Sequence, residues 1–325
     1  MIRRLLLVQV LALALSGPLA PGLAQQAGHV PVVGLLITHP PADDLVVQLF
    51  RAQLRKYGYE DGKNYKLEVR TALGQLDLVP GLAEELVRLP VDVIVVVNEV
   101  ALRASRQATR TIPIVMVGNT DDPVALGYIE SYRRPGGNIT GVFSVNAALS
   151  AKRLEILKET LPNLSRAAVL WDAFGKRQVE ELQGAARSLG IRLELIEIRD
   201  GNDLDGAFKT AKARKSGAVI MPFSPVFWIN RTRVVAIALE TGMPTITDTQ
   251  LIARAGCLLG YGSDNAYNWE RAGYYVDRLL KGANAAELPV EQLSKLTLVV
   301  NLKTAKALGI TIPESILLRA DEVIR

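Results

Sequence analysis

The order of apolar and polar residues shifts repeatedly between two patterns, one typical of buried strands and one typical of helices. VVGLLI at 32–37 and DVIVVV at 92–97 are short apolar runs, as expected for strands covered on both faces of a sheet. Between 43 and 57, apolar side chains recur at helical spacing. Further strands are expected at 66–71 and 112–117, and further helices at 78–89, 100–110 and 124–131. This alternation predicts a parallel sheet with helices on both faces.

The same alternation starts again in the second half, after the segment YRRPGGNITGVFS at 132–144. This segment places Pro135, Gly136, Gly137 and Asn138 together, a dense turn signal, before a β-branched run. Strands are expected after it at 167–171, 192–198, 218–222, 244–247 and 258–261, between helices at 150–161, 176–189, 204–215 and 230–241. The pattern therefore predicts two α/β lobes of similar size, with the turn segment carrying the backbone from one to the other. The alternative is a surface turn within one larger sheet.

The last part of the chain has a different order. An amphipathic helix is expected at 266–281, where Gly282 ends it, followed by a strand at 296–300 and a helix at 302–308. We expect these elements to return to the two lobes and complete them, because their order does not suit a third domain.

The first 24 residues have the organisation of a secretory signal peptide. Arg3 and Arg4 precede an uncharged apolar run at 5–15, and small residues up to Ala24 suit cleavage. The apolar run is too short for a bilayer core of about 30 Å, which disfavours the alternative of a membrane anchor. We therefore expect a periplasmic protein, cleaved near Ala24. Cys257 is the only cysteine, so neither a lipid-modified cysteine after the signal nor an internal disulfide is expected.

Charge and residue supply exclude several classes of function. The net charge of +5 falls to +3 once the signal segment and its two arginines are removed, and no basic stripe with interleaved aromatics suggests nucleic acid. Two histidines, His29 and His39, and one cysteine are too few for a zinc site, and no G-x-S-x-G or P-loop motif occurs. Residues 260–265 begin like a dinucleotide-binding motif but end in Asn265. We expect neither an enzyme nor a bound cofactor or metal.

Polar and aromatic residues gather where the predicted strands end. Ligands of open parallel sheets bind beyond the carboxyl ends of the strands, and the loops there lead into helices whose N-termini favour an anion. The candidates are Thr38, His39, Asn98, Asn119 and Asp122 in the first lobe, and Trp171, Asp172, Phe174, Phe223, Ser224, Asp248, Tyr261 and Asp264 in the second lobe and the hinge that follows it. Each residue alone has a structural explanation, since Asp and Asn cap helices and aromatics pack in cores. As a set pointing from two lobes, they favour a ligand site.

Longer stretches of the chain resemble one known family over nearly all of residues 30–325. They are FRAQLRKYGYEDGKNYKLEVR, LAEELVRLPVDVIVVV, TIPIVMV with DDPVALGYI, RRPGGNITG, KRLEILKETLPNLSRAAVLW, YYVDRLLKGANAAELPVEQ and VVNLKTAKALGITIPESILLRADEVI. The chain resembles the substrate-binding proteins of ABC transporters with the type I periplasmic-binding-protein fold, and among them the tryptophan- and tyrosine-binding members. The resemblance implies a secreted, non-catalytic receptor whose two lobes close on a small molecule. Nothing in the sequence requires more than a monomer.

The resemblance also implies three hinge crossovers between the lobes, at 136–142, at 262–265 and after Gly282 near Leu288. The lobes are then expected at 31–141 plus 264–288 and at 142–263 plus 289–325, after the signal peptide at 1–24.

The loops that choose the ligand depart from the family pattern. Asp172-Ala173 stands where members often have Asn-Pro, and Thr38-His39-Pro40-Pro41 stands where many have a serine-rich loop. The loop at 222–229 is more aromatic than is usual in the family.

These residues predict the chemistry of the ligand. Helix N-termini near Asn98 and Asn119 are expected to hold a carboxylate, and Asp122, Asp172 or Asp264 to pair with an amine. An aromatic wall of Trp171, Phe174 and Phe223, with Tyr261 near the hinge, would cover an apolar body. The prediction is a receptor that delivers an aromatic or large apolar amino acid to the membrane permease of an ABC importer. An aromatic acid without an amine is the close competitor, and a ligand sensor for a membrane signalling partner or an enzyme on a similar scaffold are the alternatives.

Overall fold

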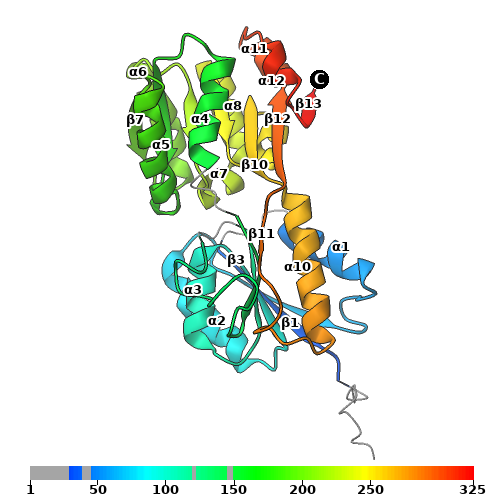
Figure 1. Cartoon of the computed structure of the whole chain (residues 1–325). Helices are drawn as coiled ribbons and strands as arrows, with labels where there is room; N and C mark the ends of the chain where they lie inside the picture. The colour runs from blue at the N-terminus through cyan, green and yellow to red at the C-terminus, as the bar shows by residue number, and fades with distance from the viewer. Residues whose placement is uncertain (1–28, 39–44, 119–121, 145–148) are drawn as a thin grey trace, which may run out of the picture.

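The computed structural model describes residues 29–38, 45–118, 122–144 and 149–325, so the expected signal segment lies outside the described part. The described chain forms two α/β lobes, one above the other in Figure 1. Each lobe has one sheet between two layers of helices, as the alternating pattern predicted. No helix within these ranges is long and apolar enough to cross a membrane.

The first lobe holds a six-stranded sheet with parallel pairing throughout. In spatial order its strands are β11 (Glu291–Gln292), β5 (Ile139–Phe143), β4 (Ile114–Val117), β3 (Val93–Val97), β1 (Val32–Ile37) and β2 (Lys66–Thr71). One face carries α1 (Leu45–Lys56) and α10 (Asn265–Leu280), and the other carries η2 (Leu76–Leu78), α2 (Val79–Arg88) and α3 (Glu99–Ala108). The strands alternate accordingly, since Val33 and Leu35 pack under α1 and α10 whereas Leu36 packs under α2 and α3.

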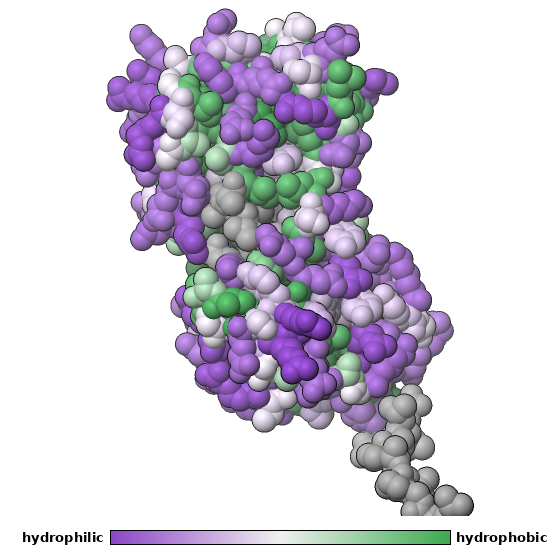
Figure 2. Space-filling view, viewed as in Figure 1, coloured by the Kyte–Doolittle hydropathy of each residue, from purple (hydrophilic) through white to green (hydrophobic). Residues whose placement is uncertain are grey.

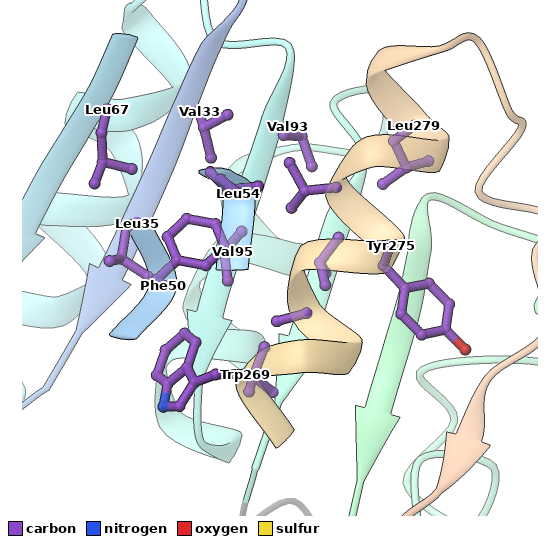
Figure 3. Packing of buried hydrophobic residues seen from close by; sticks show 14 of the residues in the cluster. Val33, Leu35, Phe50, Leu54, Leu67, Val93, Val95, Trp269, Tyr275 and Leu279 are labelled. Atoms are coloured by element: carbon purple, nitrogen blue, oxygen red, sulfur yellow. The ribbon is translucent and has the colours of Figure 1, made fainter. Parts of the chain in front are cut away.

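Packing explains why the late helix α10 returns to the first lobe. Trp269, Tyr275 and Leu279 lie on the α10 face that covers the sheet (Figure 3). The rings of Trp269 and Phe50, which comes from α1, have centroids 5.7 Å apart. Tyr275 Oη also donates a hydrogen bond to Pro289 O at 2.6 Å. Full burial of a Leu-sized side chain contributes about 1.5–3 kcal/mol, so these buried side chains hold the helix against the sheet.

The second lobe holds a seven-stranded sheet. In spatial order its strands are β13 (Glu322–Ile324), β12 (Leu296–Asn301), β10 (Leu259–Ser263), β9 (Thr245–Thr247), β8 (Val219–Met221), β6 (Arg166–Trp171) and β7 (Arg192–Glu197). Only the β10–β12 pairing is antiparallel, because β12 enters the sheet from the hinge instead of through a covering helix. One face carries α4 (Leu149–Thr160), α5 (Lys176–Ser188), α11 (Leu302–Ala307) and α12 (Glu314–Leu317), and the other carries α6 (Leu204–Ala213), α7 (Pro225–Ile229), α8 (Arg231–Thr241) and α9 (Gln250–Ala255).

The segment 136–142, expected as the first crossover, belongs to the first lobe instead. Ile139 to Phe143 are buried and form β5, which pairs with β4. Gly141 makes this pairing possible, because its φ is 119° and a Cβ there would stand 2.4 Å from Met116 O. An apolar β-branched run is stable inside a sheet and not in an exposed hinge, so the chain leaves this lobe only after β5.

The tail also stays with the first lobe for longer than expected. β11 pairs with β5 through Glu291 and Gln292, so the third crossing lies between β11 and β12 and not near Leu288. The second crossing lies at Asp264, between β10 and α10. The short helix expected at 124–131 is a run of turns, in which Gly127 has a φ of 66°.

Candidate functional site

A cavity lies between the two lobes, where the strands of both sheets end. Figure 2 shows the waist where the lobes meet, with hydrophobic side chains beside it. Two adjoining pockets form the cavity, and Phe223, Trp228 and Asn265 belong to both. The larger encloses about 670 Å³, counting space that is open to solvent, which is a size usual for small-molecule clefts.

Both lobes contribute to the walls of this cavity. The first-lobe wall, including the start of α10, consists of Val46, Leu49, Val97, Asn98, Val117, Gly118, Asn265, Asn268 and Trp269. The second-lobe wall consists of Phe223, Ser224, Pro225, Trp228, Asp248, Thr249, Leu251, Ile252 and Ser263. A molecule held between these walls touches both lobes.

Asn98 forms the polar part of the first-lobe wall. It follows β3 directly, has a φ of 78°, and caps α3 by accepting a hydrogen bond at Oδ1 from the Ala101 N–H at 3.2 Å. Its Nδ2 donates to Thr38 Oγ1 at 2.6 Å, so the buried Thr38 supports Asn98 from behind. The N-terminus of α3 is thereby placed at the cavity, where its dipole favours an anionic group.

Trp228 forms the aromatic part of the second-lobe wall. It lies on the short helix α7, which begins at Pro225 with Ser224 as its N-cap. The cap bond runs from the Val226 N–H to Ser224 Oγ at 3.0 Å. The Trp228 ring packs against the core cluster of the first lobe, to which Trp269 also belongs. This ring therefore spans the space between the lobes.

Phe223 continues the same wall beside Trp228. Its N–H donates to Gln178 Oε1 at 3.1 Å, and its ring meets Phe174 edge to face with centroids 6.1 Å apart. Phe174 is not among the lining residues, so it supports Phe223 instead of facing the cavity.

Asp248 is the acidic residue of the lining, placed directly after β9 and 7% exposed. Burial raises the pKa of its carboxyl group, and the nearby Arg153 opposes that rise. Arg153 is itself buried on α4, where burial lowers the pKa of its guanidinium group and Asp248 opposes the change. Its Nε donates to Tyr261 O at 2.7 Å. The buried cation thus stands behind the acidic wall.

Asp172 lies behind the second-lobe wall. Its Oδ1 accepts from the Phe174 N–H at 3.0 Å, and its Oδ2 accepts from Ser224 Oγ at 2.6 Å. Burial raises the pKa of this carboxyl group, although both hydrogen bonds favour the ionised form. Both of its oxygens are therefore engaged within the protein.

The predicted site residues that the structure describes thus divide into three groups. Asn98, Phe223, Ser224 and Asp248 line the cavity, and Thr38, Phe174 and Asp172 stand behind lining residues. Trp171 and Tyr261 pack against the second-lobe core, Asp122 accepts the Val124 N–H at 2.9 Å within a turn, and Asp264 caps α10. His39 and Asn119 lie outside the described residues.

Sequence reasoning missed the contribution of the first turns of α10. Asn265, Asn268 and Trp269 line the cavity, but their helix has a periodic apolar face that indicates only core packing. The position of the helix was the signal that could have revealed this, since a helix that starts at a crossing between lobes begins beside the cleft.

Within the described lining there is one acidic residue and no Lys or Arg. The described chain holds no cluster of three or more potential metal ligands.

The amino-acid sequence matches a family model described as ABC transporter substrate binding protein, over residues 30–324. A tyrosine-binding protein of Clostridioides difficile (strain R20291) is 25% identical over 279 residues, which are 85% of this chain and 79% of that protein.

Solved structures agree with this match. An ABC domain from Streptococcus pneumoniae in complex with L-Trp is 27% identical, with a TM-score of 0.80, and the match covers 91% of this chain and 100% of that one. A conserved domain protein from Vibrio cholerae shows the same identity, TM-score and coverage.

Proposed function

Because the chain belongs to the ABC transporter substrate-binding protein family, we propose that it captures an aromatic or large apolar amino acid, or a related organic acid, for an ABC importer. Proteins of this family bind small molecules, work with transporter permeases and are not enzymes. The two lobes have the type I periplasmic-binding-protein fold. The proposal concerns the class of ligand that this chain binds and its delivery to an importer.

The observation that carries the proposal is the aromatic and apolar wall built by both lobes. Trp228 and Phe223 come from the second lobe, and Trp269, Val46 and Leu49 from the first. An aromatic ring between them buries its area against both lobes at once, and the aromatic side chains add ring–ring contacts. Such a ligand stabilises the closed arrangement because only that arrangement offers both walls. Two of the relatives described above, a tyrosine-binding protein and an ABC domain in complex with L-Trp, have ligands that fit this wall.

A carboxylate on the ligand would be placed at the start of α3. Asn98 holds this end of the helix at the cavity, and no basic side chain belongs to the described lining. Backbone N–H groups and the helix dipole are then the means of binding the anion. The signal peptide expected at 1–24 supports a periplasmic location, where the chain would meet the permease as a monomer.

Titration calorimetry on the purified protein tests the proposal, with L-tryptophan, L-tyrosine, L-phenylalanine and L-leucine as probes and maltose as a negative control. L-tryptophanamide, which lacks the carboxylate, isolates the contribution of the anion. We expect saturable binding of at least one aromatic amino acid, at least tenfold weaker binding of the amide, and recovery of the ligand unchanged. Binding of the sugar alone, or of none of these compounds, contradicts the proposal.

A further inference from the structure

Polar oxygens without a close hydrogen-bond donor line the cavity, two on the second-lobe wall and one on the first. Asp248, Ser263 and Asn268 all line it and are at most 7% exposed. Ser263 Oγ and Asn268 Oδ1 are buried without a hydrogen-bond partner. The Asp248 carboxylate accepts from Thr247 Oγ1 at 3.5 Å, a long contact for a charged group. A buried carboxylate or amide oxygen without a donor costs stability, so Asp248 and Asn268 indicate a ligand that supplies donors, and the Ser263 hydroxyl is able to accept from the same ligand.

Asp248 and Ser263 lie on segments that are held close together. A Cβ on Gly262 would stand 1.9 Å from Asp248 O, so the backbones of β10 and the β9 end touch at this point. Gln250 Nε2 donates to Gly262 O at 3.0 Å and to Ser263 O at 2.8 Å, which fixes the end of β10 beside the β9 loop. Asp248 and Ser263 therefore present their side chains to one pocket.

The other acidic candidates are already engaged. Asp172 uses both oxygens on Ser224 and the Phe174 N–H, as described above. Asp122 accepts a hydrogen bond from the Val124 N–H within a turn, and Asp264 caps α10. Among the residues that the structure places in the cavity wall, Asp248 is the acid that faces the ligand space.

Arg153 makes an ionised Asp248 tolerable in this buried position. Its guanidinium group is held by Tyr261 O at 2.7 Å and by Gln178 Oε1 at 3.5 Å, both within the second lobe. Its charge favours the ionised form of Asp248 from the protein side. A ligand cation approaching from the cavity side would complete the compensation of the carboxylate.

We infer that Asp248, together with Ser263, binds a primary ammonium group of the ligand, so that the receptor selects zwitterionic amino acids over the corresponding acids without an amine. An ammonium group has three donors and no acceptor, which matches the unfilled oxygens of this wall. The ligand's carboxylate then points to α3, and its ring lies between Trp228 and Trp269. This inference rests on the proposed function and decides between the two ligand classes that it leaves open.

The test compares two pairs of probes by titration calorimetry. L-tryptophan is paired with 3-(indol-3-yl)propionate, and L-tyrosine with 3-(4-hydroxyphenyl)propionate, so each pair differs only in the amine. Both are measured on the wild type, on Asp248→Asn and Ser263→Ala, and on Asp205→Asn, which removes an exposed carboxylate from the same lobe. Loss of a hydrogen bond to a charged group changes affinity by about 10- to 100-fold.

The wild type should bind the amino acid at least tenfold more tightly than its amine-free partner. Asp248→Asn should remove most of this preference by weakening the amino acid alone, Ser263→Ala should weaken it by a few-fold, and Asp205→Asn should keep it. Equal wild-type affinity within a pair overturns the inference and leaves the proposed function standing. A variant that weakens both members equally also overturns it. Failure of every compound to bind contradicts the proposed function and the inference with it. The wild-type comparison needs no substitution, so equal affinity within a pair overturns the inference even if Asp248→Asn does not fold, and Ser263→Ala then tests the assignment to this wall.

Discussion

Lys295 and Asp264 join two of the segments that cross between the lobes. Lys295 Nζ lies 2.9 Å from Asp264 Oδ2, and the Asp264 N–H donates to Lys295 O at 3.0 Å. Asp264 stands between β10 and α10, and Lys295 stands between β11 and β12. The two crossings are thus held side by side, and they must bend together when the lobes move.

The two residues of this pair should differ in what their loss costs. Asp264 also caps α10, because its Oδ1 accepts from the Tyr267 N–H at 3.1 Å. Asp264→Ala should therefore lower the free energy of unfolding by about 1 kcal/mol through the lost cap. Lys295→Met removes an exposed ion pair and a cation contact with the Tyr267 ring, and it should cost less than the lost cap. Urea unfolding measures both, and Asp264→Asn is the control that keeps the cap and loses the charge. A Lys295 variant that costs more than the Asp264→Ala variant would contradict this account.

Asp172 should make stability fall as the pH rises in the acid range. Burial raises the pKa of its carboxyl group above the ordinary 3.8, against the hydrogen bonds from Ser224 and the Phe174 N–H. A raised pKa means that the folded state binds the proton more tightly. The stabilising contribution is therefore complete below about 3.8 and is lost as the pH rises through the raised value.

Asp172→Asn removes this loss, so the variant should gain stability over the wild type as the pH rises from 3 to 7. Chemical unfolding at several pH values measures the difference. Asp203→Asn is the opposite control, because a hydrogen bond from Arg199 lowers the pKa of Asp203. There the wild type should lose its advantage as the pH falls. An Asp172→Asn difference that does not change with pH would show that burial does not control this carboxyl group.

The fold was predictable because short stretches of the sequence are enough to indicate each strand and helix. Strands such as β3 and β4 are apolar runs, and helices such as α2 and α3 repeat apolar residues at helical spacing, so the two-lobed α/β order follows from the sequence. Strand β5 was misjudged because Pro135 to Asn138 give a strong turn signal just before it, and the sequence does not show which sheet an apolar run joins. That choice depends on the contact between Gly141 and the Met116 backbone, which forms only in three dimensions.

The candidate site was predictable only in part, for a related reason. The carboxyl ends of parallel strands meet at one edge of the sheet, so Asn98, Phe223 and Asp248 could be predicted as lining residues from the sequence. The same rule does not separate Asp248 from Asp172, because both follow strands and only the hydrogen bonds to their oxygens distinguish them. Trp269 lies on the apolar face of the helix expected at 266–281, and it both packs against Phe50 in the core and lines the cavity. The spacing of apolar residues does not show that one side chain both packs in the core and lines the cavity.

Gly141 should be among the least replaceable glycines of the first lobe. With its φ of 119° and the Met116 backbone 2.4 Å from the position of a Cβ, an alanine there would be strained and would separate β5 from β4. Gly141→Ala should lower the free energy of unfolding by about 2–4 kcal/mol. Gly137→Ala is the matched control four residues away, with no atom within 4 Å of its Cβ, and should stay within about 0.5 kcal/mol of the wild type. Thermal unfolding compares the two, and equal midpoints would mean that β5 tolerates separation from β4.

The two cavity tryptophans should separate binding from folding. Trp269 is 6% exposed and packs in the first-lobe core, so Trp269→Ala should cost about 3–5 kcal/mol of folding stability. Trp228 is partly buried on a short helix at the cavity, so its ring should matter more for the ligand than for the fold. Trp228→Ala removes the contact area of this ring, and it should weaken binding of an aromatic amino acid by about 10- to 100-fold. Trp228→Phe should recover part of that loss, and Trp171→Phe should leave affinity unchanged because Trp171 packs on the second-lobe core. Calorimetry for affinity and urea unfolding for stability are run on all four variants. If Trp228→Ala destabilises the protein as much as Trp269→Ala while its affinity stays at the wild-type level, then Trp228 serves the packing between the lobes and the aromatic wall must be placed elsewhere.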